Sequence, residues 1–482
     1  MRKVNAITIA GLCLASVFVQ RRLARRDFGP PRHRHLSESE EQFSKARTRV
    51  LILGGGFGGL AAALSLDHRI GDQPDVSVLL IDRDNSSLFS PLLWTVADGR
   101  ANPSDVVVPI RNFQRGRRFH VLQADVHGID LDRREVQTNA GVRPYDYLIV
   151  ALGSVTQIPN LPGVRENARP FRTPADAVNL RDQLVDAVEA AHRATSEEER
   201  RAWLTFVVVG GGDTGVELAA TIHSYLAGGL LYEYPWLAKT DGPAFRVVLV
   251  GRAPKLVPMQ DPGDSEATRQ ILERQGIEVR TSTDVKSVRP DAVVTSGGEI
   301  ATHTVFWAAG ISPPEVLRGL PVPSAKGGAI IVDDHLRLAA HPEVRVLGDG
   351  AWANDVSGRP IPPTAQAAQK AGGYAGEAVA ALVNGRPEIG AFRFVSRGHF
   401  ELLGPGHALA RIGPITYGGL PAYLSWHGYY LLRIPSWQRR IELLTSWTLS
   451  MIFGRELAQL RLSGAASTAP QPAAVPSSSP PR

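Results

Sequence analysis

The sequence predicts an α/β protein with two Rossmann-like domains. Two glycine-rich loops, at residues 54–59 and 210–215, each follow a short apolar strand pattern and precede an alanine-rich helical pattern. The length of 482 residues is sufficient for two or three domains. A hydrophobic content of 43% and a charged content of 21% exclude disordered and collagen-like chains.

The net charge of +6 is concentrated at the two ends of the chain. Residues 1–36 carry +7 and residues 421–466 carry +3, whereas residues 37–420 sum to −5. This distribution argues against a nucleic-acid-binding surface on the body of the protein, so the sequence predicts no nucleic-acid partner. Both basic ends suit an anionic membrane surface.

The N-terminal segment has the composition of a membrane anchor. Residues 4–20 form an uncharged, mostly apolar run of 17 residues. As a helix this run would extend for about 26 Å, the short limit for a membrane span. Arginines follow it in place of a small-residue cleavage site, which favours a retained single-span anchor with the folded part at the cytoplasmic face. A cleaved signal peptide and a start codon assigned too far upstream both stay open. Residues 31–46 are predicted to be a polar linker.

The first glycine loop lies in a complete nucleotide-binding pattern. The strand 49–53 runs directly into the loop, a helix follows, and the next strand ends in Asp82. In this arrangement Gly54 permits the tight turn, Gly56 lets the backbone approach a pyrophosphate, and Gly59 lets the helix pack on the strand. Asp82 is placed to accept hydrogen bonds from ribose hydroxyls.

The second glycine loop repeats this pattern. A strand at 204–209 precedes Gly210, Gly212 and Gly215, and the next strand covers 245–250. All three glycine roles are therefore filled again. Two complete units predict two dinucleotides, for example a permanently held flavin nucleotide and an exchanging nicotinamide nucleotide.

Four further elements surround the two units. The strand patterns at 145–154, 305–310 and 344–349 each end in a glycine turn, the last one with an acid. Thr364 is a suitable N-cap for a helix that runs to about Leu382. The second unit is therefore predicted to be inserted in a discontinuous first domain. The predicted divisions are a leader and linker at 1–46, a first domain at 47–172 and 306–392, an inserted domain at 173–305, a C-terminal region at 393–462 and a tail at 463–482.

These patterns resemble the type II (alternative) NADH:quinone oxidoreductases, a branch of the two-dinucleotide flavoproteins. The more specific parts of the resemblance are residues 81–97, residues 210–219 and the segment Pro-Pro-Thr-Ala-Gln-Ala-Ala-Gln at 362–369. The resemblance covers residues 47–460. It implies FAD as the bound cofactor, NADH or NADPH as co-substrate and a membrane quinone as electron acceptor.

The resemblance also implies roles for individual residues. Glu217 would lie near the contact between nicotinamide and flavin, and Gln366 and Gln369 would face the quinone. An exposed helix carboxylate and a plain polar helix face are the alternatives. Asp349 would bind the ribityl chain of the flavin. The residues expected to bind the two cofactors are Gly54, Gly56, Phe57, Gly58, Gly59, Asp82, Arg83, Gly153, Gly210, Gly212, Asp213, Gly215, Arg252, Gly310, Gly348, Asp349, Thr364 and Ala365.

The implied reaction is hydride transfer from the nicotinamide to flavin N5, followed by delivery of two electrons to a membrane quinone without proton pumping. The helix that begins near Thr364 would direct its positive end at the flavin. Two other functions stay open. One is a flavin reductase that supplies a ferredoxin-like partner, and the other is a flavin redox sensor with low turnover.

The cysteine content separates this chain from several relatives. The only cysteine is Cys13, in the apolar leader. A single cysteine excludes an internal disulfide framework and a multi-cysteine zinc site, and the sequence predicts no metal site. Disulfide reductases and sulfide:quinone oxidoreductases need at least two reacting cysteines, so both activities are excluded.

Two residues of the second unit depart from the family pattern. After the strand that ends at Val250 the family has an acid that binds the ribose 2′-hydroxyl, but here the chain reads Gly251-Arg252. Loss of the acid and gain of an arginine suit a 2′-phosphate, so we expect NADPH to be used at least as well as NADH. A solvated Arg252 with relaxed specificity is the alternative. Asp213 is unusual beside a pyrophosphate.

The C-terminal region is rich in aromatic and basic residues. Three of the eight tryptophans and four of the ten tyrosines lie between Tyr417 and Trp447. Amphipathic helices of this composition suit the lipid interface, which predicts peripheral binding to the cell membrane and access for a quinone. A subdomain that covers the core and a homodimer contact are the alternatives. The Ala/Pro/Ser-rich tail from Ser463 is predicted to be disordered.

Overall fold

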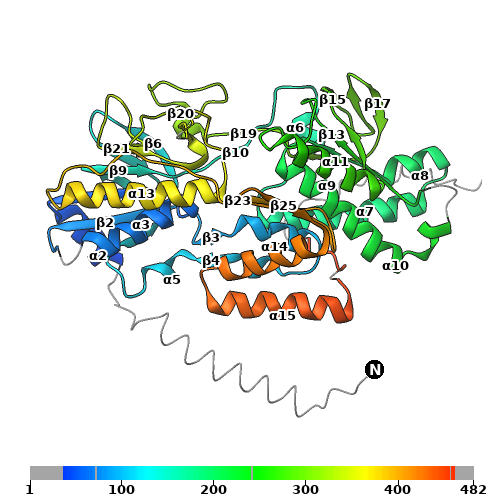
Figure 1. The fold of residues 1–482 in the computed structure, drawn as a ribbon, viewed down its shortest axis with the longest axis horizontal. Helices are drawn as coiled ribbons and strands as arrows, with labels where there is room; N and C mark the ends of the chain where they lie inside the picture. Colours follow the sequence, from blue (N-terminus) through cyan, green and yellow to red (C-terminus); the bar gives the residue numbers. More distant parts are fainter. Residues whose placement is uncertain (1–35, 71–72, 240–242, 356, 456, 462–482) are drawn as a thin grey trace, which may run out of the picture.

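The computed structural model describes residues 36–70, 73–239, 243–355, 357–455 and 457–461. The predicted anchor at residues 4–20 and the predicted tail from residue 463 lie outside these ranges. Figure 1 shows two lobes, each with its own central sheet, and a pair of helices, α14 and α15, that runs below the junction between them. The predicted α/β class with two Rossmann-like domains is confirmed.

The first lobe is built on a parallel five-stranded sheet in the order β21-β9-β1-β2-β5. Its last member, β21, reaches the sheet only after the chain has passed through the second lobe. The strands are β1 (Thr48–Leu53), β2 (Val76–Asp82), β5 (His120–Gln123), β9 (Tyr147–Val150) and β21 (Val344–Val346).

Two helices pack together on the first sheet, α3 (Phe57–Ile70) and α13 (Ala365–Val383). Their backbones approach closely, because a Cβ atom on Gly372 would lie 2.0 Å from the carbonyl oxygen of Gly58. The predicted helix start is confirmed, since the Thr364 hydroxyl accepts a hydrogen bond from the Ala367 amide at 3.2 Å. The close approach of the two helices at Gly58 and Gly372 places the N-terminal half of α13 beside the first glycine loop.

The second lobe holds a parallel sheet in the order β11-β18-β12-β13-β14. Its first strand and part of β18 lie outside the predicted division at 173–305. The strands are β11 (Ala168–Pro170), β12 (Thr205–Val209), β13 (Arg246–Val250), β14 (Glu278–Arg280) and β18 (Thr304–Trp307). The main helices are α7 (Pro174–Arg193), α9 (Asp213–Tyr225) and α11 (Pro262–Arg274).

Short elements complete the two lobes. Each lobe carries a three-stranded antiparallel sheet, β6 (Val126–Asp130), β7 (Glu135–Thr138) and β8 (Gly141–Pro144) in the first, and β15 (Val285–Val288), β16 (Ala292–Thr295) and β17 (Gly298–Ala301) in the second. The remaining elements are α4 (Leu93–Ala97), α5 (Ile110–Gln114), α6 (Val164–Asn167), α8 (Glu197–Trp203), α10 (Leu231–Glu233), α12 (Glu315–Arg318), β3 (Ser86–Leu88), β4 (Val107–Pro109), β10 (Val155–Thr156), β19 (Ile311–Ser312), β20 (Ile330–Ile331) and β22 (Ala351–Trp352).

The structure corrects the linker predicted at residues 31–46. Residues Leu36–Lys45 form the helix α2. Phe43 is fully buried and belongs to the core cluster that contains Leu79 and Tyr145. Leu36 and Phe43 are the only large apolar residues of this segment, and two such residues among eight polar ones give only a weak helical pattern, which explains why the sequence suggested a linker.

The C-terminal region begins with an antiparallel sheet that the sequence analysis did not predict. The strands β23 (Gly398–Leu402), β24 (Ala408–Ile412) and β25 (Ile415–Gly418) precede the helices α14 (Gly419–Arg433) and α15 (Trp437–Phe453). Trp426 and Trp447 are buried against the core. Apolar side chains on the other faces of the two helices are exposed, namely Leu420, Leu424, Leu432, Trp437, Leu444, Leu449, Met451, Ile452 and Phe453. Within the described ranges no helix combines the length and apolar character that a membrane crossing requires.

An extended segment after α15 returns to the second lobe. The guanidinium of Arg455 contacts the carboxylate of Asp98 and donates to the Ser224 carbonyl oxygen at 2.6 Å. Further along, the Leu460 and Arg461 amides donate to the buried Asp182 carboxylate at 3.1 and 2.8 Å. We call residue 455 together with residues 457–461 the C-terminal strap. It ties the helix pair to α7 and α9.

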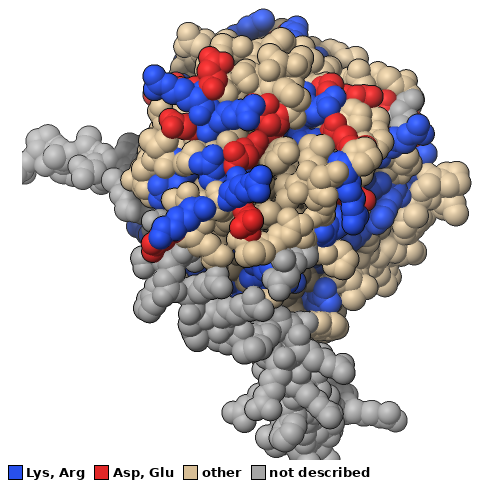
Figure 2. Space-filling model, turned by 90° about the vertical axis from the view of Figure 1, so that its left-hand side faces the viewer, with Lys and Arg blue, Asp and Glu red and all other residues tan. Residues whose placement is uncertain are grey.

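The end of the molecule formed by the first lobe carries charges of both signs. Figure 2 shows Lys and Arg side chains intermingled with Asp and Glu side chains over this face. Several of them pair, for example Arg69 with Glu377 at 2.9 Å. A surface of mixed sign creates no strong field of one sign over this face.

Candidate active site

One large cavity lies between the two lobes and the C-terminal region. Its volume is about 1520 Å³. The first glycine loop, the first two turns of α9, the start of α13 and the helix α14 all contribute to its lining. A cavity that connects both nucleotide-binding units can hold two reacting ligands in contact.

The first glycine loop has the geometry of a phosphate cradle. Gly54 adopts a φ of +98°, a region that favours glycine, and turns the chain from β1 into α3. A Cβ atom on Gly59 would lie 1.8 Å from the Gly54 carbonyl oxygen, so this glycine is required for helix–strand packing. A Cβ atom on Gly56 would meet no protein atom within 4 Å. The space beside Gly56, at the helix N-terminus, fits a pyrophosphate.

The second loop repeats these features. A Cβ atom on Gly215 would lie 1.7 Å from the Gly210 carbonyl oxygen, whereas one on Gly212 would meet no protein atom within 4 Å. The middle glycine of each loop therefore faces open space, and the third glycine of each is fixed by packing. This match supports a second dinucleotide site at the start of α9.

Asp82 lies at the end of β2, where the sequence placed it. Its carboxylate accepts hydrogen bonds from the Gly55 amide and from the Asp84 amide, the latter at 2.8 Å. Burial raises the pKa of Asp82. The side chain lines the cavity next to the first loop, and Arg83 follows it there in an exposed position.

Asp349 is held by two residues that the sequence analysis missed. The Ser154 hydroxyl donates to its carboxylate at 2.6 Å, and the Arg172 guanidinium lies 3.5 Å from the same oxygen. Arg172 also donates to the Ser154 hydroxyl at 2.7 Å. Asp349, Ser154 and Arg172 all line the cavity. The only sequence signal for Ser154 was its place directly after the turn at Gly153.

The start of α13 is fixed by Gln366. Its side-chain oxygen accepts a hydrogen bond from the Arg397 amide at 2.8 Å, which joins the helix to the segment before β23. Gln369 lies one turn further along α13, in an exposed position on the cavity wall. Arg397 and Arg433 also line the cavity and contribute two positive charges to its wall.

Glu217 is the most strongly perturbed carboxylate of the cavity wall. Only 9% of the residue is exposed, and its carboxylate accepts a hydrogen bond from the Leu402 amide at 3.1 Å. Burial, together with the nearby carboxylates of Asp213 and Glu401, raises the pKa of Glu217 well above its usual range. The environment of Glu217 therefore favours its protonated form more strongly than water does.

The structure brings most of the predicted residues to one cavity. Those on its wall are Gly54, Gly56, Phe57, Gly58, Asp82, Arg83, Gly153, Asp213, Glu217, Gly348, Asp349, Thr364, Ala365, Gln366 and Gln369. The others, which do not line it, are Gly59, Gly210, Gly212, Gly215, Arg252 and Gly310. Arg252 is exposed, just beyond the end of β13.

Comparison with known proteins agrees with this geometry. The family model described as pyridine nucleotide-disulphide oxidoreductase matches residues 48–372, more than half of the chain. The type II NADH:quinone oxidoreductase NdhA of Mycobacterium tuberculosis is 30% identical over 445 residues, which cover 89% of this chain and 92% of NdhA. The chain belongs to the type II NADH:quinone oxidoreductases, within the pyridine nucleotide-disulphide oxidoreductase family.

Two other comparisons extend this result. The demethylphylloquinone reductase NdbB of Synechocystis is 30% identical over 414 residues, which cover 83% of this chain and 96% of NdbB. A structure of NDH2 from Plasmodium falciparum in complex with NADH has the same fold, with a TM-score of 0.77, 20% identity and coverage of 85% of this chain and 99% of that one. This type II oxidoreductase is an enzyme of the NADH dehydrogenase type, and FAD with a nicotinamide nucleotide fits its two glycine loops.

Proposed function

We propose that this type II oxidoreductase is an FAD-dependent NAD(P)H:quinone oxidoreductase that binds peripherally to the cytoplasmic face of the cell membrane. The single observation that carries the proposal is the shared cavity. Its wall includes the flavin-type loop at Gly56, the nicotinamide-type helix at Glu217 and the C-terminal helix α14 with its aromatic side chains. Three ligands can therefore meet in one cavity.

Different residues would bind different parts of the two cofactors. The first loop and Asp82 would hold the adenosine and pyrophosphate of FAD, and Asp349, fixed by Ser154 and Arg172, would hold its ribityl chain. The second loop would hold the nicotinamide nucleotide. When bound, FAD supplies a two-electron acceptor for the nicotinamide hydride and a donor to the quinone.

The protein itself aligns the ligands and controls charge. The N-terminal end of α13, capped by Thr364, directs its positive dipole into the cavity, which stabilises negative charge there. Gln366 orients this helix through its contact with the Arg397 amide. Glu217 places a carboxyl group with a raised pKa in a part of the cavity wall from which solvent is largely excluded. We propose that this reaction moves no proton across the membrane.

Anaerobic mixing tests the proposed function. The purified protein with its flavin is mixed with NADH or NADPH and then with a short-chain quinone, while flavin absorbance is followed. We expect bleaching by the nucleotide and rapid recovery with the quinone. Slow bleaching without recovery would support the redox-sensor alternative. Recovery only with a soluble iron–sulfur protein would support the ferredoxin-partner alternative.

Arg252 provides a test of nucleotide preference. It follows β13 at the edge of the sheet where the ribose of the nucleotide would lie, and it is exposed. We expect Arg252→Ala to lower kcat/KM for NADPH about tenfold, because an arginine–phosphate contact is lost, and to leave NADH within about twofold. Arg274→Ala is the control. Arg274 is also exposed, but it lies at the C-terminal end of α11, near the amino ends of the strands and away from the predicted ribose site. A strong preference of the unmodified protein for NADH would refute the proposal that Arg252 binds the 2′-phosphate of NADPH.

The exposed apolar face of α14 and α15 provides a test of membrane binding. Ile452 and Phe453 are 66% and 81% exposed, and together with the other exposed apolar residues of α15 they form an apolar surface of the kind that binds lipid. We expect the double change Ile452→Asp and Phe453→Asp to weaken binding to anionic lipid vesicles about 100-fold, because each aspartate loses apolar burial and adds repulsion.

The matched control places two aspartates at Val142 and Ile331, which are 51% and 45% exposed but lie in the first lobe away from the helix pair. This variant should bind vesicles like the unmodified protein. Deletion of residues 1–35 measures the contribution of the leader, and it spares α2, whose Phe43 is part of the core. Equal loss of binding in the helix variant and the control would contradict an interfacial role for α15.

A further inference from the structure

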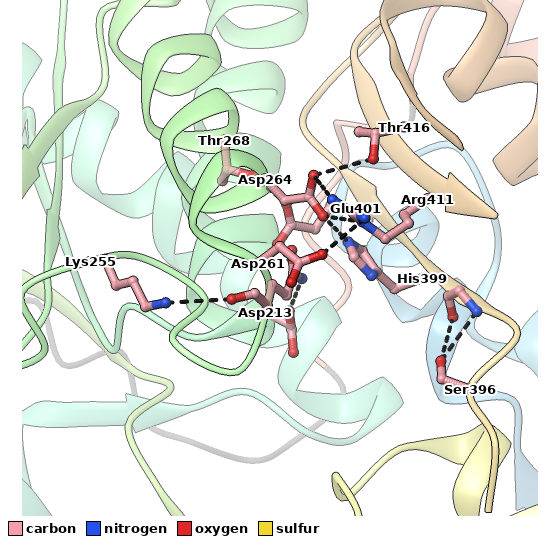
Figure 3. A network of polar contacts seen from close by, with 12 residues as sticks. Asp213, Lys255, Asp261, Asp264, Thr268, Ser396, His399, Glu401, Arg411 and Thr416 are labelled. Atoms are coloured by element: carbon pink, nitrogen blue, oxygen red, sulfur yellow. Dashed lines mark hydrogen bonds and ion pairs between the residues drawn. The ribbon is translucent and has the colours of Figure 1, made fainter. Parts of the chain in front are cut away.

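An unusual bridge between two carboxylates lies at the mouth of the nicotinamide-type site, beside the start of α9. The side-chain amide nitrogen of Gln260 donates to Asp213 at 2.7 Å and to Glu401 at 3.0 Å. Asp213 is the first residue of α9, and Glu401 lies on β23 of the C-terminal region. Figure 3 shows this network where the second lobe meets the C-terminal sheet.

The bridge occupies the place where a nucleotide would bring negative charge. Asp213 follows Gly212, whose missing Cβ leaves the open space for a pyrophosphate, and Asp213 and Gln260 both line the cavity. A helix N-terminus attracts a pyrophosphate, but a carboxylate at its first position repels one. Binding of a pyrophosphate therefore requires the negative charge at this mouth to decrease.

Glu401 is the member of the bridge that can change its charge. Only 1% of the residue is exposed, and its second oxygen accepts a hydrogen bond from the buried Thr268 hydroxyl. Burial, with a further contribution from Asp213, raises the pKa of Glu401 to about 8. Burial also raises the pKa of Asp213, although this side chain remains open to solvent through the cavity.

The surrounding charges do not neutralise the bridge. Arg411 on β24 is engaged by Asp261 at 2.9 Å and by Asp264 at 2.6 Å, as Figure 3 shows. Burial lowers the pKa of His399, which keeps this imidazole neutral at pH 7. The charged and titratable groups that face the bridge are Glu217 from α9, Lys255 from the loop after β13, Asp261 directly before α11, Asp264 from α11, His399 from β23, Arg411 from β24 and Tyr430 from α14. In the described parts of the chain no cluster of His, Cys, Asp and Glu side chains has the arrangement of a metal site.

We propose that the Asp213–Gln260–Glu401 bridge couples binding of the nicotinamide nucleotide to uptake of one proton by the protein. The inference rests on the proposed function, since it assigns the nucleotide to the second glycine loop. With the proton, the two carboxylates share a single negative charge and the pyrophosphate is accepted. Without it, the bridge carries two negative charges, that of Asp213 on the cavity wall and that of Glu401 buried behind it, and affinity falls. The bridge thus makes the affinity for nucleotide respond to pH.

Calorimetry with ADP-ribose tests the proposal on the full-length protein with its flavin. ADP-ribose carries the pyrophosphate but transfers no hydride. Titrations at pH 8.5 in two buffers of different ionisation enthalpy should show uptake of up to about three quarters of a proton, because a group with a pKa of about 8 is already about one-quarter protonated in the unbound protein at that pH. The dissociation constant should rise by up to about tenfold per pH unit above pH 8, because the unbound protein then loses the proton that the complex keeps.

Three variants identify the groups. Glu401→Gln should abolish the uptake at pH 8.5 and make the affinity independent of pH above 8. Asp213→Asn should tighten ADP-ribose binding at pH 8.5 by about tenfold, because one repelling charge is removed. Gln260→Leu keeps every charge but removes the shared donor, so the pH at which affinity declines should move upward. Glu266→Gln is the matched control, because it also replaces a glutamate by glutamine but at an exposed position on α11. It should change neither the proton uptake nor the affinity for ADP-ribose.

The outcomes separate this proposal from the proposed function. ADP-ribose that fails to bind at any pH would overturn the nucleotide site and the inference with it. Binding with no proton uptake, and with the same pH dependence in the unmodified protein and in Glu401→Gln, would overturn the inference alone. If Glu401→Gln does not fold, an unshifted pH dependence in Gln260→Leu would overturn the inference in the same way.

Discussion

Replacing Gly56 with valine should give a folded protein that has lost most of its flavin. The missing Cβ of this glycine faces open space, so the new side chain clashes with no protein atom but fills the cradle for the pyrophosphate. We expect the flavin content of the purified protein to fall at least about tenfold, since the loop amides can no longer reach the phosphates. Flavin absorbance per protein, with circular dichroism as a check of folding, measures the effect.

Three other glycines serve as comparisons. Gly59→Ala should prevent folding, because its Cβ would lie 1.8 Å from the Gly54 carbonyl oxygen. Gly263→Val, which also faces open space but lies on α11, should keep its flavin. Gly212→Val should keep its flavin and lose bleaching by either nucleotide. Full flavin in Gly56→Val would show that the first loop is not the FAD site.

The second large effect is expected for Glu217→Gln, with quinone reduction slowed about 100-fold at unchanged flavin content. The glutamine still accepts the hydrogen bond from the Leu402 amide, so the fold is preserved. The glutamine cannot take up or release a proton, whereas Glu217 can, and burial raises the pKa at which it does so. In the unmodified protein, turnover should decline as the pH rises through this raised pKa, and Glu217→Gln should lack that decline.

Glu217→Ala separates proton transfer from structure. It leaves the Leu402 amide without an acceptor, which costs about 1–3 kcal/mol, so its melting temperature should fall where that of Glu217→Gln does not. Stopped-flow measurement of the two half-reactions shows which one slows. Turnover of Glu217→Gln within about twofold of the unmodified protein would leave this carboxylate with a purely structural role.

Local sequence patterns were sufficient for the central parts of the fold. The strand predicted at 49–53 is β1 at Thr48–Leu53, and the predicted cap at Thr364 starts α13. These features depend on neighbours in the chain, namely runs of apolar residues, required glycines and side-chain caps. For this reason the sequence was sufficient to identify the two glycine loops and most of the residues that line the cavity beside the first loop.

Contacts between distant segments could not be predicted in the same way. Ser154 and Asp349 are 195 residues apart, and Gln260 and Glu401 are 141 residues apart. Neither pair carries a local pattern that points to its partner. The sheet β23–β25 did have a local signal, since Gly/Pro turns at 404–406 and 413–414 separate its three short strands, but the prediction did not use it.

The C-terminal strap limits how far the chain can be shortened. Truncation after α15 would remove Arg455 from Asp98 and two main-chain donors from the buried Asp182. Each buried acceptor left unpaired costs about 1–3 kcal/mol, and the damage would fall on α7 and α9. A detergent-free form of the enzyme is therefore better sought by polar substitutions along the outer face of α15 than by trimming, because trimming dismantles the nucleotide-binding lobe while leaving the apolar helices in place.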